Sequence, residues 1–139
     1  YPTAMFLRLR RKEQPWEVVD CKAVEPVPMY YDDEDLDVLF ISGADTRGTY
    51  VFDVRSHNGQ SRYGYQLGKA VMFAQQQLLR EVEKKGFDML LIEGWSLTLL
   101  RKGKRNRLEV QYRARAAKSR IPRKHHRPPP FMGVLHSPH

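Results

Sequence analysis

The sequence contains a single cysteine, Cys21, so no disulfide can form within the chain. This excludes the small secreted domains that depend on several disulfides, and it favours an intracellular protein. The surrounding sequence VVDCKAV is rich in apolar residues and typical of a strand. We therefore expect Cys21 to be a small buried side chain and not a nucleophile.

Long apolar runs are also missing from the sequence. No run approaches the ~20 residues of a membrane-crossing helix, and residues 1–20 lack the apolar core of a signal peptide. The glycines do not have the spacing of a phosphate-binding loop, because neither GxGxxG after a predicted strand nor GxxxxGK occurs. We expect no membrane partner and no cofactor.

Residues that could hold a structural metal are scarce. Four of the five histidines lie in residues 117–139, a segment that contains no Cys, Asp or Glu. Structural zinc needs about four ligands, usually with cysteine or carboxylate companions. We therefore predict no metal site.

Carboxylates that could serve catalysis are few and poorly spaced. A metal-dependent nuclease places an acid on one strand and an acid-x-Lys triplet on a following strand. Asp20, Cys21 and Lys22 give such a triplet, but it precedes the other strand acids, Asp53 and Glu93. No catalytic residue is predicted, and a nuclease is our third hypothesis, behind two that are not enzymatic. Glu93, inside the apolar run LLIEGWSLTLL, needs a partner if it is buried.

Acids are nearly absent from residues 101–127, where Glu109 is accompanied by 12 Lys and Arg. The other residues hold 12 Lys and Arg against 15 acids, so the net charge of +8 is concentrated in one segment. Neutralising closely spaced phosphates releases counterions and gives affinity without a pocket. We predict a non-enzymatic module that contacts DNA or RNA through Arg101, Lys102, Lys104, Arg105, Arg107, Arg113, Arg115, Lys118, Arg120, Arg123 and Lys124.

A second hypothesis is a protein-interaction domain of a larger intracellular assembly. Residues 117–139 contain PPP at 128–130, which favours an extended docking strap for another chain. The acidic turn DDEDLD at 32–37 is another surface for a protein partner, or for the basic hairpin itself. The run KSRIPRKHHR at 118–127 has the composition of a nuclear-import signal and predicts a nuclear location.

The hydrophobic periodicity predicts one helix and several strands. Leu67, Val71, Ala74, Leu78 and Val82 recur at helical spacing. The predicted helix spans 65–85. The predicted strands span 4–11, 16–24, 38–41 paired with 50–54 in a hairpin, 87–100 buried on both faces, and 107–116, with a loop and acidic turn over 25–37.

The order of these elements predicts an α+β domain with two layers, a mainly antiparallel sheet packed against one long α-helix. The last two strands form a hairpin that turns at Lys102, Gly103 and Lys104. We expect one compact domain over residues 1–116 and a basic tail or arm, rich in proline and histidine, over 117–139.

Overall fold

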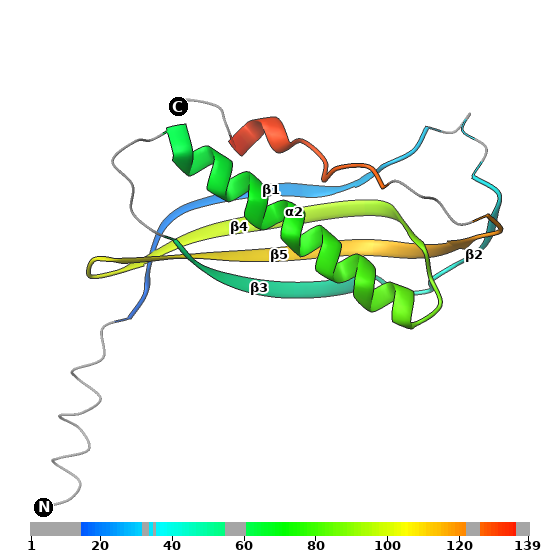
Figure 1. Cartoon of the computed structure of the whole chain (residues 1–139), viewed down its shortest axis with the longest axis horizontal. Helices are drawn as coiled ribbons and strands as arrows, with labels where there is room; N and C mark the ends of the chain where they lie inside the picture. The colour runs from blue at the N-terminus through cyan, green and yellow to red at the C-terminus, as the bar shows by residue number, and fades with distance from the viewer. Residues whose placement is uncertain (1–14, 32–33, 35, 55–60, 122–125, 136–139) are drawn as a thin grey trace, which may run out of the picture.

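The computed structural model describes residues 15–31, 34, 36–54, 61–121 and 126–135. The predicted strand over 4–11 lies outside these residues. In chain order the elements are β1 (Glu17–Pro28), β2 (Val38–Ile41), β3 (Thr46–Val54), α2 (Ser61–Lys84), β4 (Met89–Lys102), β5 (Arg105–Ser119) and the short 3-10 helix η1 (Met132–Leu135) (Figure 1).

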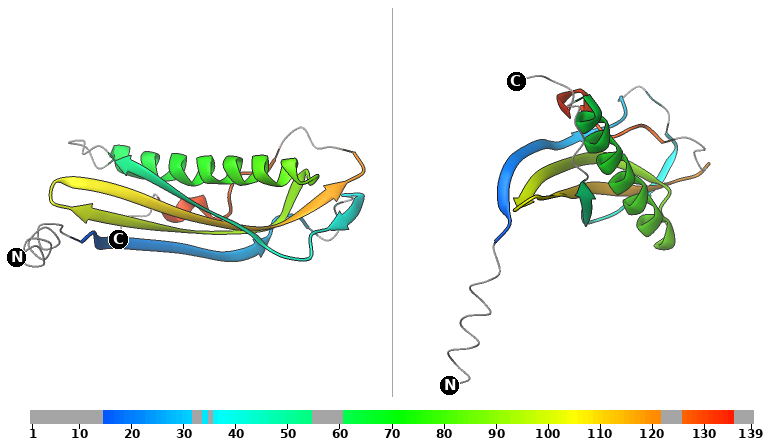
Figure 2. Two further views of the ribbon diagram at one scale, coloured as in Figure 1. Left: turned by 90° about the horizontal axis from the view of Figure 1, so that it is seen from below. Right: turned by 60° about the vertical axis from the view of Figure 1, so that its left-hand side comes forward.

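The five strands form one antiparallel sheet, in which β4 and β5 lie between β1 and the pair β2 and β3. Helix α2 crosses one face of this sheet (Figure 2). The predicted α+β class, with a mainly antiparallel sheet against one long helix, is confirmed for the described residues. We call the face away from α2 the open face.

The periodic apolar residues of α2 explain its position. Val71, Ala74, Leu78 and Val82 are fully buried against the sheet, as their spacing predicts. The helix ends at Lys84 and is followed by Gly86, whose φ of 96° is a conformation that suits glycine. Within the described residues, no helix has both the length and the apolar character needed to cross a membrane.

Strands β4 and β5 form the predicted hairpin. The turn contains Gly103 with a φ of 62°, the left-handed conformation expected there. Along β5, alternate side chains are buried beneath α2: Leu108, Val110, Tyr112 and Ala114. The expectation that 87–100 is buried on both faces is wrong, because Ser96 and Thr98 of β4 are partly exposed on the open face.

Strands β2 and β3 do not form the predicted hairpin. Both pair with β5, one after the other: β3 lies opposite residues 106–114 and β2 opposite residues 117–119. The 15 residues of β5 are enough to pair with both strands along the same side. A long partner strand that follows later in the chain therefore replaces the local pairing.

Strand β1 continues through residues predicted as a loop. It runs to Pro28, and the pairing with β4 shifts between Val24 and Val27, which places Pro26 in a bulge. Proline lacks the N–H of a sheet ladder but is tolerated at bulges and on edge strands. Because β1 is an edge strand, Pro26 does not end it, and the strand continues to Pro28.

The predicted tail is partly integrated into the domain. Strand β5 extends to Ser119, three residues beyond the boundary predicted at 116. Residues 126–135 run beside α2 (Figure 1), and Leu135 belongs to the same core as the helix and the sheet. Pro129 and Pro130 are also buried.

Candidate nucleic-acid interface

The predicted contact residues fall into two groups that differ in their ion pairs. Nine of the 11 are described; Arg123 and Lys124 lie outside the described residues. Five of the nine have an acidic partner. The pairs and their N–O distances are Arg107 with Asp53 (3.8 Å), Arg113 with Glu25 (3.9 Å), Arg115 with Asp45 (2.8 Å), Lys118 with Asp88 (3.7 Å) and Arg120 with Asp37 (3.2 Å).

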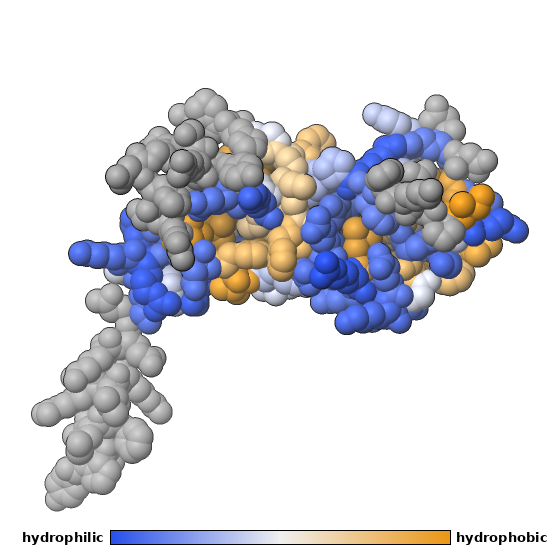
Figure 3. All heavy atoms as spheres, viewed as in Figure 1, coloured by the Kyte–Doolittle hydropathy of each residue, from blue (hydrophilic) through white to orange (hydrophobic). Residues whose placement is uncertain are grey.

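The other four side chains surround the turn of the hairpin, and we call them the hairpin tip: Arg101, Lys102, Lys104 and Arg105. None of them forms an ion pair with an acid that the structure describes. The turn projects from one end of the sheet (Figure 1), and hydrophilic side chains gather at that end (Figure 3). The hairpin tip is therefore the part of the predicted interface whose charge is not locally neutralised.

An indole ring lies at the base of the hairpin tip. The ring centroid of Trp16 is 4.2 Å from Cζ of Arg107, 5.5 Å from Cζ of Arg105 and 5.9 Å from Nζ of Lys102. Cations are attracted to the face of an indole at such distances. The Trp16 ring therefore holds three cationic side chains close together, next to a turn that contains no acidic residue.

Sequence reasoning did not find Trp16. Two other aromatic residues of the hairpin strands, Trp95 and Tyr112, are buried in the core. Trp16 reaches the tip because β1 pairs with β4, so that Glu17 lies opposite Arg101. This pairing joins residues far apart in the chain, and no local pattern reveals it.

The described acids of the 32–37 turn do not contact the hairpin tip. Glu34 pairs with Arg127, and Asp37 pairs with Arg120. These contacts lie at the end of the sheet opposite the hairpin turn (Figure 1). The acidic turn is thus joined to the basic residues that follow β5, while Asp32, Asp33 and Asp35 lie outside the described residues.

The candidate catalytic acids lie on different faces of the sheet. Asp53 pairs with Arg107 on the open face. Glu93 is buried under α2, where its Oε1 accepts hydrogen bonds from Tyr112 Oη (2.6 Å) and Gln75 Nε2 (2.7 Å). Burial raises the pKa of Glu93 to about 7, although both hydrogen bonds act to lower the pKa. The two carboxylates therefore share no cleft.

Two further expectations concern metal ligands and the cysteine. In the part of the chain that the structure describes, no three His, Cys, Asp or Glu side chains come together as a metal site. Cys21 was expected to be buried, and this is wrong: it is exposed on the open face, with Sγ 3.7 Å from Thr98 Oγ1. The alternation of β1 turns Lys22 toward the tail, where its Nζ donates to the Val134 carbonyl, and therefore turns Cys21 to the other face.

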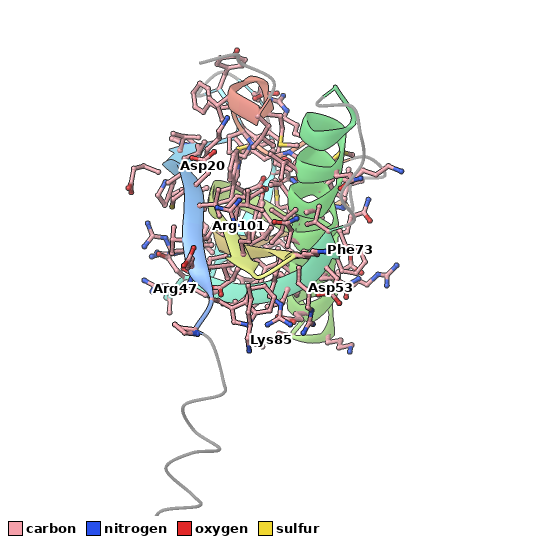
Figure 4. All side chains as sticks on the ribbon, turned by 90° about the vertical axis from the view of Figure 1, so that its left-hand side faces the viewer. Asp20, Arg47, Asp53, Phe73, Lys85 and Arg101 are labelled. Atoms are coloured by element: carbon pink, nitrogen blue, oxygen red, sulfur yellow. The ribbon has the colours of Figure 1, made fainter. Side chains whose placement is uncertain are left out.

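The register of the sheet also brings together open-face residues that were not predicted as a site. Arg47 of β3 lies directly opposite Arg113 of β5, and Thr49 lies opposite Gln111. Arg47 is on the side of the sheet away from Phe73, a residue of α2 (Figure 4). Next to this row the open face is hollowed, with Arg47 and Arg113 among the lining residues.

Comparisons with protein-family models, with curated proteins and with solved structures found no match to this chain.

Proposed function

We propose that the protein is a binding module that contacts nucleic acid through phosphate groups, and that the hairpin tip makes these contacts. The observation that carries the proposal is the difference in ion pairing. The four cations of the tip have no acidic partner among the described residues, whereas Arg107 and Arg115 along β5 each have one. Arg113, between them, has only a loose contact of 3.9 Å with the exposed Glu25.

Unpaired cations are the better phosphate ligands for a simple reason. A cation that already contacts a carboxylate must lose that contact, or share it, before it binds a phosphate. A cation in solvent exchanges only water and counterions, and the released counterions favour binding. The proposed interface is therefore narrower than the surface predicted from the sequence, and it is centred on the turn.

The tip also has a suitable shape. A two-stranded β-ribbon fits the major groove of duplex DNA, and a projecting turn reaches the backbone of a single strand. The strands of the hairpin are paired from Met89 opposite Ala117 to Lys102 opposite Arg105, so the turn has a rigid base. The ring of Trp16 keeps Arg105 and Lys102 close to this base.

A comparison of two triple variants tests the proposal. The tip variant is Arg101→Gln, Lys104→Gln, Arg105→Gln, and the matched control is Arg80→Gln, Lys84→Gln, Lys85→Gln at exposed positions of α2 and the turn after it. Both variants remove three positive charges. Fluorescence anisotropy with a labelled 20-nucleotide single strand, and with the same sequence as a duplex, measures the affinity.

We expect the tip variant to bind at least tenfold more weakly at 0.1 M salt, because phosphate contacts dominate such affinities. We expect the control to change affinity by less than about twofold, since it alters only distant charge. Circular dichroism checks that both variants keep the fold. Equal losses in the two variants would mean that net charge, and not the tip, causes binding, and the proposal would then be wrong.

The alternative of residues 117–139 as a docking strap for another chain has less support. Pro129, Pro130 and Leu135 are buried on the protein's own domain, so these side chains are not offered to a partner. A nuclear location stays a prediction from the basic run at 118–127.

A further inference from the structure

Two arginines face each other across neighbouring strands on the open face. Arg47 of β3 and Arg113 of β5 are direct partners in the antiparallel register. Residues directly opposite each other in such a sheet have Cβ atoms about 4.5–5.5 Å apart. Two guanidinium groups therefore start from neighbouring positions on the same face.

The arginines border a hollow of about 370 Å³ in the open face. Its lining includes short or polar side chains from four strands: Ala23 of β1, Ser96 of β4, Gln111 of β5 and Thr49 of β3. These four residues form one row across the sheet. Because their side chains are short or polar, the hollow has room and also hydrogen-bonding groups.

The bulge of β1 builds one wall of the hollow. Gly94 of β4 allows the bulge to approach closely, because a Cβ on Gly94 would lie 2.6 Å from the backbone nitrogen of Pro26. Such a separation is far below van der Waals contact, so no larger residue fits at this position with the same backbone. Glycine at this position and proline in the bulge thus shape the site.

The positive charge of the pair Arg47 and Arg113 is only loosely compensated. Like charges directly opposite each other destabilise a sheet. Glu25 is the one acid that the structure places within ion-pair distance of Arg113, but the separation is 3.9 Å and the Glu25 side chain is 92% exposed. Arg47 has no ion pair among the described residues. An anion between the two guanidinium groups would remove the repulsion.

We propose that the hollow binds the phosphate group of a small phosphate monoester. Two guanidinium forks match the oxygens of a phosphate, which carries about −1.5 to −2 charges at neutral pH. The hydroxyl groups of Ser96 and Thr49 and the amide of Gln111 are further polar groups of the lining. The lining also includes Glu25, whose side chain is 92% exposed. A volume of about 370 Å³ is at the small end of ordinary ligand sites, which fits a ligand of sugar-phosphate size.

This site is separate from the hairpin tip and does not rest on the proposed nucleic-acid binding. No residue of the tip lines the hollow. The two proposals can therefore fail independently: the triple tip variant should keep phosphate-monoester binding, and loss of the Arg47 and Arg113 pair should leave the tip intact.

An NMR titration of the full chain with glucose 6-phosphate tests the proposal, with glucose as the neutral control and inorganic phosphate as the minimal probe. We expect saturable shifts of backbone amides at 47–49, 94–96 and 111–113 with the ester and with phosphate, and none with glucose. Shifts confined to 101–105, or no saturation up to 20 mM ester, would overturn the proposal. So would saturable shifts at the hollow with a single-stranded oligonucleotide but not with the ester.

Single variants distinguish direct guanidinium contacts with the phosphate from the effect of net charge on affinity. Arg47→Gln and Arg113→Gln should each raise the Kd for glucose 6-phosphate at least tenfold. Arg47→Lys keeps the charge but lacks the guanidinium group, and it should raise this Kd by a smaller factor. Arg80→Gln, on the exposed side of α2, should leave the Kd unchanged. Because Arg47 is exposed, its variants should fold, and a thermal shift adds a second readout: phosphate should raise the Tm of the wild type but not of Arg47→Gln. Equal Kd values for the wild type and Arg47→Gln would contradict the proposal.

Discussion

Glu93 is an ionisable side chain in a place that disfavours its charge. It is 3% exposed, and Gln75, one of its two hydrogen-bond donors, also donates to the carbonyl oxygen of Arg127. The carboxyl group thus lies under the segment that crosses the sheet beside α2. Because Oε1 accepts from both Tyr112 and Gln75, the group is held in one orientation whichever protonation state it has.

The raised pKa of Glu93 makes stability depend on pH. The pKa is about 7 in the folded protein, whereas the ordinary pKa of a glutamate in solvent is 4.5. Between these values the folded state binds more protons than the unfolded state, so stability falls as pH rises. The contribution of Glu93 is fully present below pH 4.5 and is lost as pH passes about 7. A shift of this size corresponds to an effect on the order of 3 kcal/mol.

The Glu93→Gln variant should remove this pH dependence. Glutamine keeps the shape and an oxygen acceptor for Tyr112 and Gln75, but it has no charge to bury. We expect the variant to lie within about 1 kcal/mol of the wild type at pH 5 and to be more stable by about 2–3 kcal/mol at pH 8. Urea unfolding at both pH values measures the difference, with the exposed Glu83→Gln as the control. If the wild type and Glu93→Gln lost the same stability between pH 5 and pH 8, the assignment would be wrong.

The segment around η1 acts as a strap that covers part of the core. Trp95 Nε1 donates to the Pro130 carbonyl (2.9 Å), and Lys22 Nζ donates to the Val134 carbonyl (2.9 Å). Leu135 is 4% exposed and packs with the residues of α2 and the sheet. The strap therefore completes the core, and folding should depend on it.

Two neighbouring residues of η1 provide a matched test of the strap. Leu135→Ala should destabilise the protein by about 2–4 kcal/mol, because it removes a buried side chain and leaves a cavity. Val134→Ala, at a side chain that is 39% exposed, should cost less than about 1 kcal/mol. Chemical unfolding gives both values. Equal, small costs would mean that the strap contributes little to the fold.

Some elements were predictable from the sequence because their signals are local. The 3.6-residue apolar period of α2 can be recognised from residues close together in the chain. The same is true of the alternation of apolar residues along β5 and of the glycine turn that precedes it. The positions of β2 and β1 depend on distant partners. The order of the strands in the sheet explains why β2 pairs with β5 and not with β3. It also explains why Pro26 is tolerated in β1, which is an edge strand.

For the whole molecule, the sequence reveals the charge of a segment but not its partners. The excess of cations in residues 101–127 is visible in the sequence. Folding then places Asp53, Asp45 and Glu25 next to the arginines of β5, and it leaves the tip without such neighbours. The opposed pair Arg47 and Arg113 also appears only with the register, because the two residues belong to strands that are far apart in the chain.

The charge distribution therefore defines two surfaces with different expected ligands. The tip carries cations without an ion pair among the described residues at one end of the molecule, which suits a long polyanion. The hollow carries two arginines among short polar side chains, which suits one phosphate group. Both surfaces would bind their ligands through the oxyanions of those ligands. Salt should affect the two interactions differently, because a polyanion releases many condensed counterions on binding and a single phosphate does not.

The salt dependence of oligonucleotide affinity tests the central claim most directly. For a single strand, each neutralised phosphate adds about −0.7 to the slope of log K against log salt concentration. Four contacts from the hairpin tip predict a slope of about −3 for the wild type, and the tip variant with one remaining cation should give about −1. A wild-type affinity that does not change between 0.05 and 0.3 M salt, or the same slope in the tip variant, would contradict the account.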